Sequence, residues 1–553
     1  MLFNIKLRHP IDCFSRFIES SKYLSLEPPD TSGCKEYKVV VMKVISLVLF
    51  VLLFIASVDE SVPAQSKKKP QQLDKINIQK KPIAEDKQPP KRPDELVYFV
   101  NNVRSAQPEF AADLLIRLAL SDKITDPAWK SEMLEEAFRL APDVQQPFKR
   151  AFKTWNPIDT RAGFLGYTFE LELDTLSLQC RAVKAMLKID KAKALSLFNE
   201  IPKLKLEPVG CEESLIYDVS SYYSLLAGLA QTAFDKKESQ RNEHIYFLES
   251  RINDVVSPVQ IGSVAEAISA IKLSPDETQR LVSALGSVLG KISGRDRAFW
   301  FSDRTTEAGM SKLLAVCQER EIATDGLLKA YRFYLVKQLS GSRCADPYDW
   351  FKGAGKNYTA AFNSRMLPKT AKNIQPISAD EIKPSEITGE ESLYLYWQSH
   401  KSQEFLAKAQ KLNLGIDNKR ISDTERNTAD WRSKVNDFVK DMANWHKEDE
   451  KSEEDYFHQK CILYVGLLDV LMLGSTRDYV MKNYVSLLNE FDLQRDSRIE
   501  WFWQARHIIQ IVTTAPGEIR SKLMGELDVS RNTILYLYTE LGRLNTQPIA
   551  SKM

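Results

Sequence analysis

The stretch FAADLLIRLALSDKITDPAWKSEMLEEAFRLAP, residues 110–142, contains two apolar faces at helical spacing with a short connection between them. Asp126 directly precedes Pro127, and this order is typical of an N-cap followed by proline at the first helical position. The second apolar face ends at Ala141 and Pro142, because proline cannot continue a helix. The stretch therefore predicts two helices joined by a short turn.

Apolar residues at helical spacing recur through most of the chain after this pair. The densest region runs from Thr175 to Asp235, where Asp190 divides two amphipathic segments. Only 21 of the 553 residues are glycine, whereas sandwiches and barrels use glycine in their many turns. With 43% hydrophobic residues the chain can also bury a substantial core. We expect an all-α fold, an array of antiparallel helix pairs arranged as an α-solenoid or a toroid.

Two local patterns resemble known helical proteins. The small-apolar-proline ending at Leu140, Ala141 and Pro142 is similar to the close of a tetratricopeptide repeat, although no fixed repeat period covers the chain. The segment from Tyr217 to Tyr223, which opens an Ala/Leu-rich helix, resembles helical modules of exported bacterial proteins of unknown function. These resemblances imply a helical-repeat protein and carry no functional residues.

Three glycines, Gly286, Gly290 and Gly294, follow one another at intervals of four residues. Small residues at this spacing share one helix face and allow a neighbouring backbone to approach closely. Because Lys291 and Arg295 stand among them, we interpret the pattern as close core packing and not as a membrane dimer face.

An uncharged apolar run, Val44 to Val58, lies near the N-terminus. Met42 and Lys43 precede it, and small residues ending at Ala64 follow at the spacing that a signal peptidase reads. We predict that residues 42–64 are a signal peptide that begins at Met42 and is cleaved after Ala64. A membrane anchor is the alternative, since lysine near the end of a span can reach the interface. With a start at Met42, residues 1–41 are a non-structural extension.

Composition divides the remaining chain into four parts. Residues 65–93 are rich in Pro, Lys and Gln and predict a disordered basic linker. Residues 94–365 form the expected N-terminal helical repeat region, residues 366–392 a proline-containing linker, and residues 393–545 a C-terminal helical region. In the last region helices are expected around Trp431–His446, Tyr456–Leu473, Tyr479–Asn489 and Ile499–Val512. We interpret the charge run His446–Asp455 as a solvated helix end or loop and not as a binding cluster.

The chain has seven cysteines, and the first two precede the apolar run. Export to an oxidising compartment would favour two disulfides and one free thiol among the other five. Cys180 and Cys211 flank one helical segment, and Cys317 and Cys344 flank the helix expected at Asp325–Leu339. These four are the candidate disulfide cysteines, in those pairs, and buried free thiols are the alternative. The seven are Cys13, Cys34, Cys180, Cys211, Cys317, Cys344 and Cys461.

Catalytic and metal-binding motifs are not found in the sequence. It contains no zinc-protease helix, nucleophile elbow or closely spaced cysteine pair. His458 and Cys461 share a helix face, but a metal site needs three or four converging ligands. Carboxylates are too numerous to single out an acid pair for glycosidic cleavage. We therefore assign no catalytic, cofactor-binding or metal-binding residue and no cofactor.

Residues 523–534, LMGELDVSRNTI, resemble the helix-turn-helix of bacterial winged-helix regulators. The resemblance implies a recognition helix that approaches phosphates and bases. The sequence departs from that pattern at Leu535 and Tyr536, where the family usually has basic side chains. The alternative is a terminal helix whose apolar side chains pack on the rest of the protein. The DNA-facing residues that the resemblance implies are Ser530, Arg531 and Thr533.

These patterns together favour an exported helical-repeat scaffold, periplasmic, extracellular or membrane-anchored with its helical body outside the cytoplasm. We expect its partner to be another protein or a cell-envelope polymer. Membrane contact is expected only through Val44–Val58, and a net charge of +2 gives no reason to expect nucleic acid. Two alternatives stay open. A secreted all-α polysaccharide-active enzyme would have a deep cleft lined by carboxylates and aromatic rings, and a DNA-binding regulator would be cytoplasmic.

Overall fold

The structure is a computed structural model of the 553-residue chain. The expected extension 1–41, the signal or anchor segment 42–64 and all but the last two residues of the linker 65–93 lie outside the described residues. Within the described part, no helix is both long and apolar enough to cross a bilayer. The structure describes residues 92–151, 166, 168–211, 213, 215–345, 350–368, 373–383, 386–390, 399–412, 422–450, 453–472, 474–491, 498–514 and 533–546.

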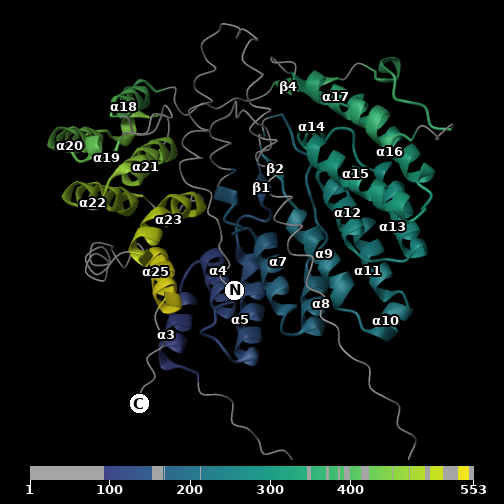
Figure 1. The fold of residues 1–553 in the computed structure, drawn as a ribbon, viewed down its shortest axis with the longest axis horizontal. Helices are drawn as coiled ribbons and strands as arrows, with labels where there is room; N and C mark the ends of the chain where they lie inside the picture. Colours follow the sequence, from purple (N-terminus) through teal and green to yellow (C-terminus); the bar gives the residue numbers. More distant parts are fainter. Residues whose placement is uncertain are drawn as a thin grey trace, which may run out of the picture. The chain divides into compact units, whose positions relative to one another are not determined.

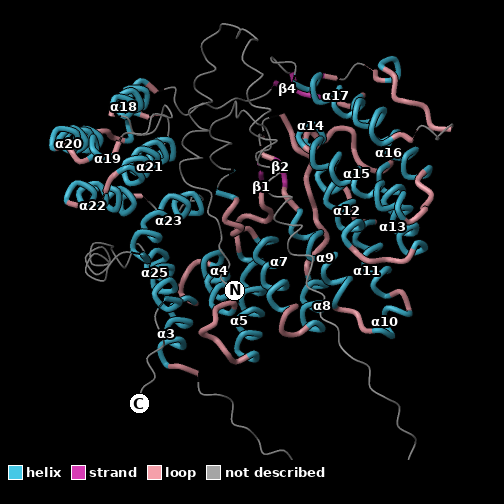
Figure 2. The backbone as a smooth tube through the Cα atoms, viewed as in Figure 1, coloured by secondary structure: helices cyan, strands magenta, loops and turns pink. Residues whose placement is uncertain are grey.

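Helices make up most of the described chain, which confirms the all-α prediction (Figure 2). The first helices are α3 (Asp94–Val103), α4 (Pro108–Ala119), α5 (Pro127–Leu140), α7 (Thr175–Met186), α8 (Lys191–Glu200), α9 (Ser220–Thr232), α10 (Lys236–Gln240), α11 (Glu243–Ile252), α12 (Pro258–Ala270), α13 (Pro275–Leu289), α14 (Ala298–Phe301), α15 (Asp303–Glu319), α16 (Asp325–Leu339) and α17 (Trp350–Ala361). The later helices are α18 (His400–Lys411), α19 (Asp423–Arg426), α20 (Ala429–Ala443), α21 (Glu453–Val470), α22 (Ser475–Glu490), α23 (Arg498–Thr514) and α25 (Thr533–Thr546).

Strands are few and short in this part of the chain. An antiparallel pair joins β1 (Arg150–Ala151) to β2 (Ile216–Tyr217). A parallel pair joins β3 (Arg343–Ala345) to β4 (Ile387–Glu390). Each pair is a two-stranded sheet that joins segments far apart in the sequence, so these sheets fasten connections between helices.

Local capping explains where several helices begin. The Asp126 carboxylate accepts a hydrogen bond from the Ala128 amide at 3.0 Å, with Pro127 as the first helical residue of α5, as predicted. Asp190 separates α7 from α8 and accepts from the Lys193 amide at 2.9 Å. The predicted helix Asp325–Leu339 is found with the same bounds as α16. The C-terminal helices were placed correctly to within a few residues at each end.

Helices of the N-terminal part of the chain pack together, among them α4 with α5, α5 with α7, and α9 with α12 (Figure 1). Their buried faces form one hydrophobic cluster that continues into the C-terminal helices. The described residues of 366–392 pack on α16, since Arg332 donates to the carbonyls of Gln375 and Pro376 and pairs with Glu381.

A glycine pair allows the backbones of α12 and α15 to touch. A methyl group on Gly262 would overlap the backbone of Thr305, and one on Gly309 would overlap the Gly262 carbonyl. Glycine is therefore required at both positions, because only a residue without a Cβ atom lets the two backbones touch. This contact was not anticipated from the sequence.

The three glycines at intervals of four residues behave differently from one another. A methyl group on Gly286 would make ordinary contact, 3.8 Å, with Ala330 of α16. Gly290 has no neighbouring atom within 4 Å of that position. Helix α13 ends at Leu289, so Gly294 is not on the helix and lies instead beside Lys337. The predicted glycine face on a single helix is therefore wrong, although Gly286 does face α16.

A fully buried carboxylate, Asp113 of α4, connects the beginning of the described chain to its end. Arg117 donates to it at 2.7 Å, Arg181 of α7 pairs with its other oxygen, and the Tyr538 hydroxyl of α25 donates a hydrogen bond to it. Helix α25 lies against α3 and α4 (Figure 1), and α23 adds an ion pair from Arg498 to Glu109 at 3.1 Å. The first and last helices thus share a charged interface.

Replacement of Gly262 by alanine should lower the free energy of unfolding by about 1–3 kcal/mol, because α12 and α15 must separate to admit the methyl group. Gly228 lies in the middle of α9 with no atom within 4 Å of an added Cβ. Gly228→Ala is therefore the matched control and should stabilise the protein by about 0.5–1 kcal/mol. Denaturant unfolding measures both changes, and equal effects of the two substitutions would contradict the packing.

Asp113→Asn should destabilise the protein by about 3–5 kcal/mol at neutral pH, because it leaves two arginines without their buried partner. Burial raises the pKa of Asp113, but the charges of Arg117 and Arg181 and the Tyr538 hydrogen bond outweigh it and lower that pKa to about 2. The resulting stabilisation, about 2 kcal/mol, is complete above pH 4 and is lost as the pH falls toward 2.

Unfolding titrations of the wild type and Asp113→Asn between pH 7 and pH 2 measure this difference. The variant should lose less stability over the acid limb than the wild type. Asp430→Asn, which removes an exposed ion pair with Lys434, should cost less than about 1 kcal/mol and serves as the control. Parallel acid limbs for the wild type and Asp113→Asn would contradict the assignment.

Candidate functional site

The candidate disulfide cysteines pair differently from the prediction. Cys211 is bonded to Cys344, whereas Cys180 and Cys317 are free and buried, as is Cys461. The predicted pairs Cys180–Cys211 and Cys317–Cys344 are therefore wrong. The reason is that Cys180 and Cys317 lie on the buried faces of α7 and α15. Cys344 lies in β3, which pairs with β4, and Cys211 lies in a turn beside Gly389 of β4.

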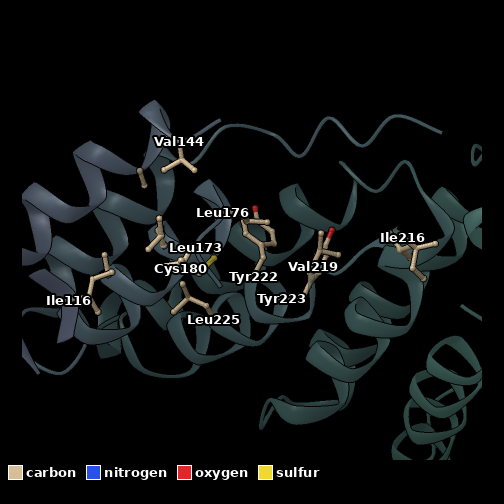
Figure 3. Packing of buried hydrophobic residues seen from close by; sticks show 14 of the residues in the cluster. Ile116, Val144, Leu173, Leu176, Cys180, Ile216, Val219, Tyr222, Tyr223 and Leu225 are labelled. Carbon is tan, nitrogen blue, oxygen red and sulfur yellow. The ribbon is translucent and has the colours of Figure 1, made fainter. Parts of the chain in front are cut away.

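The free thiols sit in apolar surroundings. Figure 3 shows Cys180 in the same hydrophobic cluster as Leu173 and Leu225. Burial raises the pKa of the Cys180, Cys317 and Cys461 thiols. A thiol is nucleophilic only as the thiolate, so these three side chains act as core residues and not as reactive groups.

Peptide mapping of the non-reduced protein should recover a cross-linked peptide that contains Cys211 and Cys344. Under native conditions Cys180, Cys317 and Cys461 should resist alkylation, and denaturant without reductant should expose them because no disulfide holds them. In the chain-entropy model, closing this loop of 133 residues stabilises the fold by about 5 kcal/mol. Alkylation of Cys211 and Cys344 without reductant would contradict the pairing.

The segment that resembles a helix-turn-helix is described only from Thr533, and Ser530 and Arg531 lie outside the described residues. From Thr533 to Leu544 every side chain of α25 is buried or half-buried against α3, α4 and α23. The one basic residue of α25, Arg543, pairs with Glu540 and with Glu95 of α3. Helix α25 thus lacks the exposed basic face with which a recognition helix contacts DNA. It packs by its apolar side chains.

A cleft of about 250 Å³ opens at the C-terminal end of α22, and we call it the α22 cleft. Its walls come from the loop before α21, the first turns of α21 and the last turn of α22. Carboxylates and aromatic rings predominate in its lining. The lining residues are His446, Lys447, Glu448, Glu453, Tyr456, Phe457, Leu487, Glu490 and Phe491.

The walls of the α22 cleft are held by buried contacts. The rings of Phe457 and Phe491 stack with centroids 4.1 Å apart and join α21 to the end of α22. Behind the wall, Lys460 donates to the Tyr456 hydroxyl at 2.8 Å and to the Trp445 carbonyl at 3.0 Å. Asp449 accepts from the His446 amide at 3.1 Å and fixes the turn that carries Glu448. The charged side chains therefore project from a rigid base.

The lining of the α22 cleft carries an excess of negative charge. Three carboxylates, Glu448, Glu453 and Glu490, face one lysine, Lys447. The C-terminal end of α22 adds the partial negative charge of its last carbonyl groups. Both contributions favour a cation in the cleft.

Acid–base chemistry is less well supported than binding. Burial lowers the pKa of Lys460 to about 8 and raises the pKa of Tyr456 above its usual range. Tyr456 is therefore a protonated phenol at neutral pH, and Lys460 lies behind the cleft wall and not in its lining. No group of metal-ligating side chains converges anywhere in the described residues.

Sequence reasoning missed this site. The charge run His446–Asp455, predicted to be a solvated helix end or loop and not a binding cluster, supplies His446, Lys447, Glu448 and Glu453 of the cleft lining. It is in part exposed as expected, but it also faces the end of α22. The only signal in the sequence was the mixture of carboxylates with Tyr456 and Phe457, which is also typical of an ordinary helix start.

Comparisons with known proteins give no relative for this chain: no protein family, no curated protein and no solved structure matches it. The resemblances to tetratricopeptide repeats and to winged-helix regulators stay predictions. The function is therefore argued from this chain's own residues.

Proposed function

We propose that this protein is an extracytoplasmic helical interaction protein that binds a basic segment of a partner protein in the α22 cleft. The observation that carries the proposal is the cleft itself, in which three carboxylates and aromatic rings converge at a helix C-terminus. The paired helices from α3 to α17 form, in this proposal, a solenoid-like array that supports the C-terminal helices.

The disulfide supports the location. Cys211 and Cys344 are 133 residues apart, and such structural disulfides persist in oxidising compartments and are rare in the cytosol. The apolar run Val44–Val58 and the small residues before Gln65 have the pattern of a signal peptide, which would direct export. Peptide mapping of the disulfide therefore tests the compartment independently of the ligand.

The size of the cleft favours one long side chain as its occupant. Pockets for drug-sized ligands span about 300–1,000 Å³, and this cleft has about 250 Å³. Arginine suits it well, because a guanidinium group bonds carboxylates in a planar fork and stacks on aromatic rings. The aromatic rings in the lining offer faces of the kind on which a guanidinium group stacks.

The alternatives fit the observations less well. A polysaccharide-active enzyme would also have carboxylates and aromatic rings in its cleft, but a chain of sugar rings needs more room than this cleft provides. A DNA-binding regulator would need a basic exposed face on α25, whose one basic side chain is paired with glutamates. Hydrolysis of a polysaccharide that is abolished by Glu490→Gln would favour the enzyme.

The double variant Glu448→Gln/Glu490→Gln should weaken the binding of an arginine-rich decapeptide by about five-fold for each charge removed, since a solvent-accessible ion pair contributes up to about 1 kcal/mol. Both side chains are exposed, so the substitutions leave the core intact. Fluorescence anisotropy with a labelled peptide and the full chain measures the affinity, which should fall as salt is raised.

The matched control is Asp437→Asn, which removes an exposed carboxylate of α20 that pairs only with Lys440 among the described residues. It should leave the affinity unchanged. A glutamate-rich decapeptide should not bind. Equal binding of the arginine-rich peptide by the wild type and the double variant would overturn the proposal for the cleft.

A further inference from the structure

A second, smaller hollow of about 40 Å³ lies at the other end of α22, and we call it the α22 N-terminal hollow. Its lining is more polar than apolar and contains no carboxylate. Two arginines and the first residues of α22 surround it. The lining residues are Arg426, Asn427, Arg432, Leu471, Met472, Gly474, Ser475 and Thr476.

The helix N-terminus at this hollow has no side-chain cap. Gly474 occupies the N-cap position with φ of +148°, a conformation that residues with a Cβ rarely adopt, and it has no side chain that could accept from the first-turn amides. Helix α22 is 16 residues long, so its N-terminus carries a substantial positive partial charge. Uncapped amides and this charge together form a typical anion-binding arrangement.

Thr476 provides an independent observation that points to a ligand. Its side chain is only 8% exposed and lines the hollow. Among the described residues its hydroxyl has no hydrogen-bond partner. A ligand oxygen in the hollow would give this hydroxyl a hydrogen-bond partner.

Each of the two arginines also donates a hydrogen bond to a protein group. Arg426 donates to the Val470 carbonyl at 3.0 Å, and Arg432 donates to the Asn427 side-chain oxygen at 3.0 Å. A guanidinium group has five N–H donors, so the bond of Arg432 to Asn427 uses only one of them. Paired arginines with a helix N-terminus match the oxygens of a tetrahedral anion.

We propose that the α22 N-terminal hollow binds a phosphate group, held by Arg426, Arg432, the Thr476 hydroxyl and the first amides of α22. The volume admits one such group and little more, so the remainder of any phosphate ester extends into solvent. This site is separate from the α22 cleft and does not depend on the function proposed for it.

Titration of inorganic phosphate into the full chain, followed by phosphorus NMR line broadening at constant ionic strength, tests the proposal. The wild type should show saturable broadening. Glycerol phosphate should compete if the site accepts esters, whereas competition by inorganic phosphate and sulfate alone would restrict the ligand to the free anion. The absence of saturable broadening would overturn the proposal.

Two variants assign the binding to the hollow. Arg432→Gln should weaken phosphate binding by about ten-fold, the lower end of the range for a hydrogen bond to a charged group. Thr476→Val should weaken it by about five-fold while preserving the fold, because it removes one hydrogen-bonding hydroxyl and keeps the shape of the side chain.

Lys434→Gln is the matched control. It removes one positive charge from the exposed surface of the same helix, α20, where Lys434 pairs with Asp430 at 2.6 Å. This variant should bind phosphate as the wild type does. Equal weakening by Arg432→Gln and Lys434→Gln, with no effect of Thr476→Val, would show only a general charge effect and would also overturn the proposal.

Discussion

The arrangement of the described helices depends on the buried carboxylate of Asp113. Burying a carboxylate away from water costs several kcal/mol unless its oxygens accept hydrogen bonds from the protein. Here three side chains donate to the Asp113 carboxylate. They come from α4 itself, from α7 and from α25. Tyr538 of α25 is 425 positions away from Asp113 in the sequence. Because an incomplete set is so unfavourable, this network selects one docking geometry for the last helix. Hydrophobic contact alone would allow other docking geometries of α25.

The sequence allowed prediction of features that depend on neighbouring residues. The start of α5 follows from Asp126 and Pro127, and the division between α7 and α8 follows from Asp190, because each cap acts within three residues. The pairing of Cys211 with Cys344 and the contact of Gly262 with Gly309 could not be predicted in the same way. Both depend on which distant segments meet, and a cysteine or a glycine looks the same in the sequence whatever it meets.

The candidate site shows the same limit. The local pattern of His446–Asp455 is that of an exposed loop before a helix, and several of its side chains are in fact exposed. What makes the segment a cleft wall is Glu490 and Phe491, which the end of α22 brings from about 40 residues away. No periodic pattern in the sequence indicates that these two segments come together. Likewise, the α22 N-terminal hollow joins Arg426 and Arg432 to Thr476, and no motif spans them.

The two hollows lie at the two ends of one helix, and their charges have opposite signs. The lining of the N-terminal hollow contains arginines without carboxylates, and that of the C-terminal cleft contains three glutamates and one lysine. The peptide dipoles of α22 place positive potential at the first and negative potential at the second, so the backbone and the side chains act in the same direction at each end. Side chains of the opposite sign would normally be expected there, since they stabilise a helix: acidic residues at its start and basic residues at its end. The first turn of α22 follows that pattern with Asp478, whereas its last turn has no basic residue. The departure at the C-terminal end favours binding, because it leaves that end to be satisfied by a cation from outside the chain.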